Sequence, residues 1–152
     1  MRNEGTVEID RPIDEVFYLT KDHVAEWSII VVEDELLEEK PDRVGTTFRT
    51  VTEENGRRME FHGVVTREEP PHVSAVHLTG KTFDIDVEYT FEDLGGQTRV
   101  KQVSFVTGKG VFRVFLFLCG WLMNKSSCKS TDNELNSLKK FCEEYGGVES
   151  SS

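Results

Sequence analysis

The amino-acid sequence predicts an α+β fold in one domain: a curved, seven-stranded antiparallel sheet wrapped around a long C-terminal helix, with two short helices after the first strand. Three features lead to this prediction. Turn signals divide residues 29–107 into short strand-like segments, apolar residues between 13 and 20 recur at helical spacing, and residues 111–145 read as one long helix or two abutting ones. A chain of 152 residues can build its own hydrophobic core.

The N-terminal part of the chain predicts one strand and two helices. Residues 2–10 alternate weakly between polar and apolar side chains, as a strand does. Pro12 suits the first turn of a helix, and Ile13, Val16 and Phe17 follow at helical spacing. Residues 21–27 predict a second short helix, whose Trp27 either fills the core or contacts a ligand.

The middle of the chain predicts an antiparallel meander. Turn signals lie at 41–42 (Pro-Asp), 55–56 (Asn-Gly), 70–71 (Pro-Pro), 80–81 (Gly-Lys) and 95–96 (Gly-Gly). They separate strands at 29–39, 45–54, 57–68, 73–79, 82–92 and 98–107. With the first strand, the sheet therefore has seven strands.

Short turns also predict which side chains face the core, because directly opposed residues of antiparallel strands point to the same face. Apolar and acidic residues alternate in 82–92, so the apolar row must face inward. Carried across the turns, this row pairs Tyr89 with Gln102, Val87 with Ser74, and Ser74 with Arg67. The apolar residues expected to be buried are Phe48, Phe61, Val76, Ile85, Val87, Tyr89, Phe91 and Val100, whereas Glu60, His62, His77 and Glu88 face outward.

The same register turns several polar residues inward: Thr50, Arg67, Ser74, Tyr89, Gln102 and Ser104. A solid core seldom holds so many polar groups. They lie either at a sheet end that meets solvent or in a ligand cavity with a few convergent polar groups. For a cavity, the candidate ligand-binding residues on the strands and on the inner face of the last helix are Phe48, Phe61, Arg67, Ser74, Val76, Val87, Tyr89, Gln102, Ser104, Phe117, Asn124 and Cys128.

The two halves of the last helix have apolar faces that do not line up. The apolar face of the second half consists of Cys128, Thr131, Leu135, Leu138, Cys142 and Tyr145. A straight helix extended backwards places the apolar stripe Val111, Phe115, Leu118 and Leu122 on the opposite side. Three explanations remain open. The helix breaks or rotates near Ser126, the stripe docks on a second subunit or an insertion loop, or it makes weak contact with a membrane surface.

Seven short motifs follow one another along nearly the whole chain. They are Arg11-Pro12-x-x-Glu15-Val16-Phe17, Glu26-Trp27, Val44-Gly45-Thr46-x-Phe48, Glu69-Pro70-Pro71, Tyr89-Thr90-Phe91-Glu92, Gly95-Gly96-x-Thr98-Arg99-Val100 and Asn133-x-Leu135-x-x-Leu138-Lys139. With these motifs and this order of elements, the sequence resembles the START-like or Bet v 1-like (SRPBCC) superfamily, and within it the polyketide cyclase/dehydrase-type branch.

The resemblance implies a helix-grip fold with a deep cavity between the sheet and the last helix. It implies one START-like ligand-binding domain over residues 1–147, and we expect a disordered tail at 148–152. Members of this superfamily bind lipids, sterols, polyketides and plant hormones, and some catalyse cyclisation or dehydration. The fold does not decide among these functions.

Few residues are candidates for catalysis. His62 and His77 lie on adjacent strands but face outward and belong to no metal-binding motif, so we expect neither a metal nor a cofactor. If the protein is an enzyme, Tyr89 as a proton donor and Arg67 as an enolate stabiliser are the candidate catalytic residues. The register turns no carboxylate or histidine inward to act as a base, which favours binding over catalysis.

Composition restricts the partners and the compartment. The formal charge is −10, and the cations are scattered, which argues against nucleic acid. The longest apolar run, Val111 to Met123, is too short to cross a bilayer. The N-terminus lacks the apolar run of a signal peptide, and the three cysteines are spaced too far apart on one helix to pair. We therefore expect a reducing, cytoplasmic compartment.

Three functions fit these observations. The first is a carrier or sensor of a small, mostly hydrophobic ligand, such as a lipid-like or polyketide-like molecule. The second is a cofactor-free polyketide cyclase or dehydratase, which would turn over its ligand. The third is a protein-interaction or regulatory module that uses the apolar stripe of the last helix, and such a module would have a small or collapsed cavity.

Overall fold

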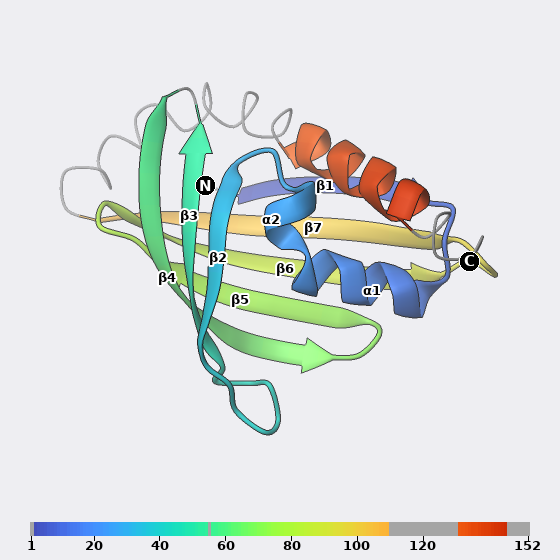
Figure 1. Cartoon of the computed structure of the whole chain (residues 1–152), viewed down its shortest axis with the longest axis horizontal. Helices are drawn as coiled ribbons and strands as arrows, with labels where there is room; N and C mark the ends of the chain where they lie inside the picture. Colours follow the sequence, from blue (N-terminus) through green and yellow to red (C-terminus); the bar gives the residue numbers. More distant parts are fainter. Residues whose placement is uncertain (1, 55, 110–130, 146–152) are drawn as a thin grey trace.

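A computed structural model describes residues 2–54, 56–109 and 131–145 of the chain (Figure 1). The elements follow the predicted order: β1 (Arg2–Ile9), α1 (Ile13–Asp22), α2 (Val24–Trp27), β2 (Val31–Glu38), β3 (Thr47–Glu54), β4 (Arg57–Glu69), β5 (Val73–Thr79), β6 (Phe83–Asp93) and β7 (Thr98–Gly108). Residues 131–145 form a further helix, called the C-terminal helix here. The predicted helix-grip fold is therefore confirmed, with the part of the last helix before residue 131 outside the described residues.

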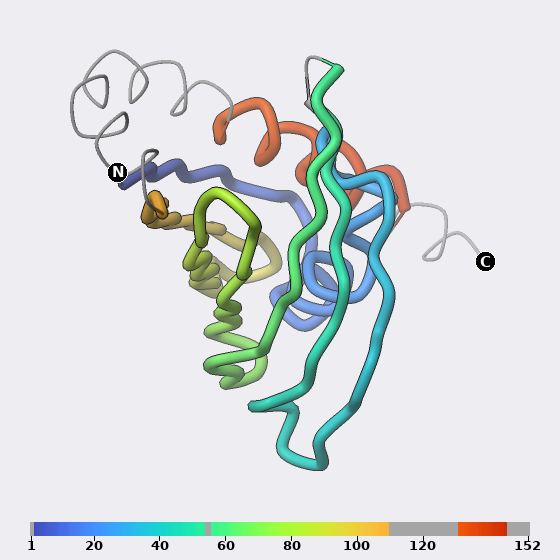
Figure 2. The backbone as a smooth tube through the Cα atoms, turned by 90° about the vertical axis from the view of Figure 1, so that its left-hand side faces the viewer, coloured from blue at the N-terminus to red at the C-terminus, as the bar shows by residue number. Residues whose placement is uncertain are grey.

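The seven strands form one antiparallel sheet in the order β1-β7-β6-β5-β4-β3-β2. Strands β2 to β7 make the predicted meander, and β1 pairs with β7 at the far edge. The sheet bends strongly, so that β2, β3 and β4 cross the direction of β5, β6 and β7 (Figures 1 and 2). The helices α1 and α2 and the C-terminal helix lie inside this bend.

Most of the predicted register is confirmed. Tyr89 pairs with Gln102 across the turn at 95–96, and Phe61 pairs with Thr50 across the turn at 55–56. The register between β5 and β6 was wrong by two residues, because Ser74 pairs with Tyr89 instead of Val87. The turn at 80–81 is wider than two residues, since the amide of Gly80 donates to the carbonyl of Phe83 at 3.1 Å. A shift of two leaves each side chain on its predicted face.

The prediction that Arg67 faces inward is wrong. The pairing of β4 with β5 is irregular between Val65 and Arg67, where β4 carries one extra residue. Such a bulge interrupts the alternation of side chains. The side chain of Arg67 is 52% exposed and forms an ion pair with Glu69, whereas Glu68, next in the chain, turns inward with a side chain only 5% exposed.

The hydrophobic core lies at one end of the bend. It joins α1, α2 and the C-terminal helix to β1, β6 and β7, through Ile9, Ile13, Val16, Phe17, Leu19, Trp27, Phe91, Val100, Leu135, Leu138 and Cys142. The rings of Phe17 and Phe91 meet edge to face with centroids 5.2 Å apart. Leu135, Leu138 and Cys142 are almost entirely buried, so the predicted apolar face of the C-terminal helix is confirmed for the residues described.

Several predictions lie outside the described residues. They concern the candidate ligand-binding residues Phe117, Asn124 and Cys128, the apolar stripe Val111, Phe115, Leu118 and Leu122, and the tail 148–152. Among the helices that are described, none has the length and apolar character needed to span a membrane. The one cysteine in the described ranges, Cys142, is a buried free thiol.

Candidate ligand cavity

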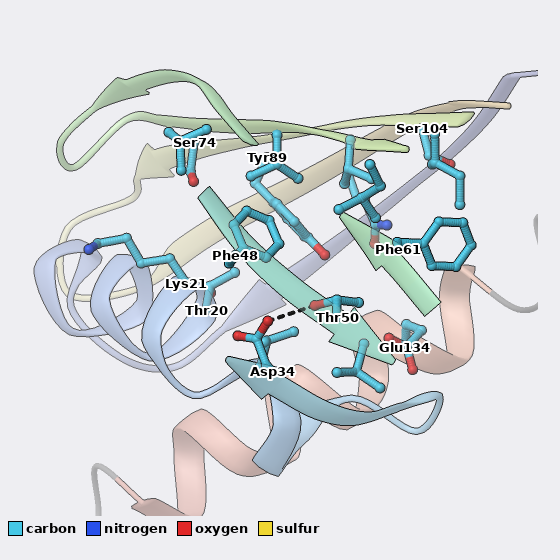
Figure 3. Close-up of a pocket in the computed structure, with 18 of the residues that line it drawn as sticks. Thr20, Lys21, Asp34, Phe48, Thr50, Phe61, Ser74, Tyr89, Ser104 and Glu134 are labelled. Atoms are coloured by element: carbon cyan, nitrogen blue, oxygen red, sulfur yellow. Dashed lines mark hydrogen bonds between the residues drawn. The ribbon is translucent and has the colours of Figure 1, made fainter. Parts of the chain in front are cut away.

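A cavity of about 630 Å³ lies within the bend of the sheet (Figure 3). The described residues that line it come from all seven strands, from α1 and α2, and from the first turn of the C-terminal helix. The concave sheet and the helices above it therefore enclose a hollow next to the packed core. Of the two explanations for the inward polar residues, a cavity accounts for them better than a bare sheet end.

Eight of the residues predicted to bind a ligand line this cavity: Phe48, Phe61, Ser74, Val76, Val87, Tyr89, Gln102 and Ser104. Arg67 does not, because the bulge turns it outward. Phe61, Phe91 and Val100 are buried as predicted, but Phe48, Val76, Ile85, Val87 and Tyr89 are only half-buried. Their remaining surface faces the cavity, and this explains why the prediction of full burial was wrong for them.

Aromatic rings form much of the wall. The rings of Trp27 and Tyr89 meet edge to face at 6.5 Å, and those of Phe61 and Phe83 are 5.7 Å apart. The indole of Trp27 donates to the carbonyl of Thr20 at 3.0 Å, which fixes the ring. Gly63 on β4 leaves room for the ring of Phe48, because a Cβ at this position would overlap that ring.

The Tyr89 phenol is the central polar group of the cavity (Figure 3). Burial, with a smaller contribution from the charge of Glu134, raises the pKa of Tyr89 far above its ordinary value of 10.0. The hydroxyl forms no hydrogen bond within the described residues, and it stays protonated at physiological pH. Tyr89 can therefore donate a hydrogen bond to a ligand.

Four carboxylates line the cavity that the sequence did not place there: Asp22, Asp34, Glu68 and Glu134. The expectation that no carboxylate faces inward is therefore wrong. Asp34 accepts a hydrogen bond of 2.6 Å from the hydroxyl of Thr50, and burial raises the pKa of this carboxyl. Asp34 is nevertheless one of the exposed residues of β2, because it faces the hollow rather than packed atoms.

Glu134 and Glu68 each link different elements of the fold. Glu134 accepts hydrogen bonds of 2.6 Å from the hydroxyl of Ser28 and from the amide of Ile29, which links the C-terminal helix to the start of β2. Glu68 lies 3.3 Å from the guanidinium of Arg43 and 3.8 Å from the ammonium of Lys21. The ion pairs of Glu68 therefore join α1, β4 and the loop between β2 and β3 beside the cavity.

Two amide side chains of the lining carry unsatisfied acceptors. The carbonyl oxygens of Asn3 and Gln102 are buried and have no hydrogen-bond partner among the described residues. Asn3 itself is only 6% exposed. Buried polar atoms usually have a partner, so both positions can receive a hydrogen-bond donor from a ligand or from water.

The sequence signals for the missed carboxylates differ. Asp34 lies on β2, and the long loop between Glu38 and Thr47 transfers no register from β3 to this strand. Glu68 is displaced by the bulge, which no residue pattern announces. Glu134 could have been found, because it lies next to Leu135 and three residues from Thr131, on the border of the apolar face.

The histidines of the outer face do not form a metal site with their neighbours. His62 is exposed, and His77 Nδ1 lies 2.6 Å from the carboxylate of Asp86 on the convex side of the sheet. Within the residues that the structure describes, no group of three or more His, Cys, Asp and Glu side chains could hold a metal ion. The predicted outward orientation of both histidines is confirmed.

Comparison with known proteins extends these observations. Residues 2–133 match the family described as polyketide cyclase / dehydrase and lipid transport. The fold is similar to that of a Thermus thermophilus protein, with 18% identity, a TM-score of 0.79 and 100% of both chains covered. It is also similar to a START superfamily protein from Mycobacterium smegmatis, with 16% identity, a TM-score of 0.80, and 95% of this chain and 98% of the other covered.

A third similar structure is the ZhuI aromatase/cyclase from a Streptomyces species, with 16% identity, a TM-score of 0.76, and 94% of this chain and 93% of the other covered. Identities this low concern the fold alone. No curated protein sequence matches the chain significantly.

Proposed function

Because the chain belongs to the family described as polyketide cyclase / dehydrase and lipid transport, we propose that its cavity binds a small, mostly hydrophobic ligand. In this proposal the protein is a cytoplasmic carrier or sensor that holds the ligand between the sheet and the helices. The ligand-binding residues are those of the predicted set that line the cavity, with Tyr89 as the central donor.

The observation that carries the proposal is the volume of the cavity together with its lining. About 630 Å³ falls in the range of pockets that enclose drug-sized ligands, roughly 300–1,000 Å³. Phe48, Phe61, Val76 and Val87 supply apolar surface, and a few polar groups from different strands converge on the same space. A hollow of this kind leaves apolar surface in contact with water, and an apolar ligand would remove it.

A cofactor-free cyclase or dehydratase is the second candidate. The predicted catalytic pair of Tyr89 and Arg67 is not brought together, because Arg67 lies outside the cavity. Asp34 favours this candidate instead, since its carboxyl could exchange protons with a ligand that also contacts Tyr89. An enzyme returns its ligand with changed mass or connectivity, whereas a carrier returns it unchanged.

The third candidate, a protein-interaction module, depends on the apolar stripe Val111, Phe115, Leu118 and Leu122. These residues lie outside the described part of the chain, so docking on a second copy or on a membrane surface stays a prediction from the sequence.

Native mass spectrometry of the protein purified from its own source tests the carrier proposal, alongside a fluorescence-anisotropy titration with pyrenemethanol. Val87→Trp places a large side chain in the cavity, and Phe105→Trp places the same side chain on the outer face of the neighbouring strand. We expect the wild type and Phe105→Trp to carry a bound small molecule and to bind pyrenemethanol, and Val87→Trp to lose both. A wild type that binds neither, or a Val87→Trp protein that binds as well as the wild type, would refute the proposal.

A further inference from the structure

The described lining of the cavity is acidic. Two cationic side chains face four acidic ones, a formal balance of −2: Lys21 and Arg43 against Asp22, Asp34, Glu68 and Glu134. The whole chain has the same sign, with a formal charge of −10. An anionic ligand is therefore repelled both on approach and inside the cavity, whereas a cationic one is attracted.

Both cations of the lining are already engaged. Arg43 lies 3.3 Å from the Glu68 carboxylate and 3.1 Å from that of Glu39. Lys21 lies 3.3 Å from Asp22 and 3.8 Å from Glu68. A ligand carboxylate or phosphate would have to compete with these partners, so neither cation is an obvious anchor for an acidic head group.

Asp34 has no such partner. No Lys, Arg or His nitrogen of the described residues lies within ion-pair distance of its carboxylate, whose one hydrogen bond comes from Thr50. Protein atoms around Asp34 disfavour the charged form and raise its pKa. A cation placed beside this exposed carboxylate would pair with a charge that, within the described residues, has only the Thr50 hydroxyl as a partner.

The surroundings of Asp34 also suit a cation with an apolar body. Figure 3 shows Phe48, Thr50 and Tyr89 on the same side of the Asp34 carboxylate, and all four residues line the cavity. Aromatic faces attract cations within about 6 Å. The carbonyl oxygens of Asn3 and Gln102 add acceptors without donors in the same cavity.

We propose that the ligand is an amphipathic amine, whose protonated amino group pairs with the Asp34 carboxylate while its apolar body lies against Phe48, Tyr89 and Val87. This inference rests on the proposed function, since it presumes that a ligand occupies the cavity. It names the head group of that ligand and excludes fatty acids and other carboxylates as preferred ligands.

Three fluorescent probes test the head group. Pyrenemethylamine, pyrenemethanol and pyrenecarboxylate share one ring system and differ in charge, and fluorescence anisotropy at neutral pH and low salt measures their affinities. We expect the amine to bind about two- to fivefold more tightly than the alcohol, as one exposed ion pair allows, and the carboxylate to bind most weakly. Asp34→Asn should remove most of the preference for the amine, since only the weaker attraction of the remaining acidic charges is left.

Glu35→Gln is the matched control, because it removes the same charge from the next residue of β2, on the outer face, where Glu35 lies 3.9 Å from Arg49. It should keep the amine preference. Asp34→Asn should melt close to the wild-type temperature, since Asp34 is exposed and no cationic side chain of the described residues pairs with it.

The outcomes separate the two proposals. If none of the three probes binds the wild type, the carrier proposal fails and the amine proposal fails with it. If the alcohol binds the wild type as tightly as the amine, or if Asp34→Asn keeps the preference, only the amine proposal is wrong.

Discussion

The two ends of the concave face differ in how completely they are filled. At one end Ile9, Val100 and Leu138 have no exposed surface, because α1 and the C-terminal helix press directly on the sheet. At the other end Phe48 and Val87 are half-buried around a hollow of about 630 Å³. Strands β1, β6 and β7 contribute to both ends.

Strand β6 passes through both environments. Phe91 near its end is 4% exposed and packs on Phe17, whereas Tyr89 and Val87 on the same face line the cavity. Alternation along β6 therefore decides which face of the sheet a side chain occupies. The helices packed on that face decide whether the side chain is buried or lines the cavity. The two ends should respond differently to the same kind of substitution.

The largest effect is expected at the packed end. Leu138→Ala leaves a void among rigid neighbours and should lower the free energy of unfolding by about 2–5 kcal/mol, whereas Val87→Ala at the hollow end should lower it by less than about 1 kcal/mol. Urea denaturation followed by circular dichroism measures both. Equal losses for the two variants would mean that the two ends do not differ in packing.

A medium effect is expected where β4 approaches β3. Gly63→Ala introduces a Cβ that overlaps the ring of Phe48, so the ring should move into the cavity. We expect a loss of about 1–3 kcal/mol in stability and weaker pyrenemethanol binding. Val64→Ala, one residue further and on the outer face, is the control and should leave binding unchanged. Unchanged binding in Gly63→Ala would show that Phe48 does not limit the cavity.

The smallest effect is expected for the phenol. Tyr89→Phe removes a hydroxyl that has no partner among the described residues, so the free energy of unfolding should change by less than about 0.5 kcal/mol. Affinity for pyrenemethanol, which can accept a hydrogen bond, should fall measurably in an anisotropy titration. A loss of stability above about 1.5 kcal/mol would place the hydroxyl in a hydrogen-bonded network instead of a hollow.

The fold was largely predictable because a tight turn fixes which residues of two consecutive strands lie opposite each other. The turn at 55–56 predicted the pairing of β3 with β4 correctly, residue by residue. The turn at 95–96 did the same for β6 and β7. The wider turn at 80–81 produced an error of two residues, which the alternation of side chains tolerates.

The site was predictable only where strands follow regular alternation. Phe61, Ser74 and Gln102 were placed in the cavity from the register alone. The bulge in β4 exchanged Arg67 for Glu68, and the loop before β3 hid the facing of Asp34. The sequence therefore revealed the apolar walls through regular alternation, while a bulge and a long loop hid two of the charges of the cavity, those of Glu68 and Asp34.

The hollow end also makes the stability of this protein depend on the composition of its surroundings. A ligand that binds only the folded chain adds RT ln(1 + [L]/Kd) to the free energy of unfolding, about 2.7 kcal/mol at a hundredfold excess over Kd. Its binding should release water from Phe48, Val76 and Val87 and so carry a negative heat-capacity change. The melting temperature of the protein in a crude extract would then report how much of its ligand that extract contains.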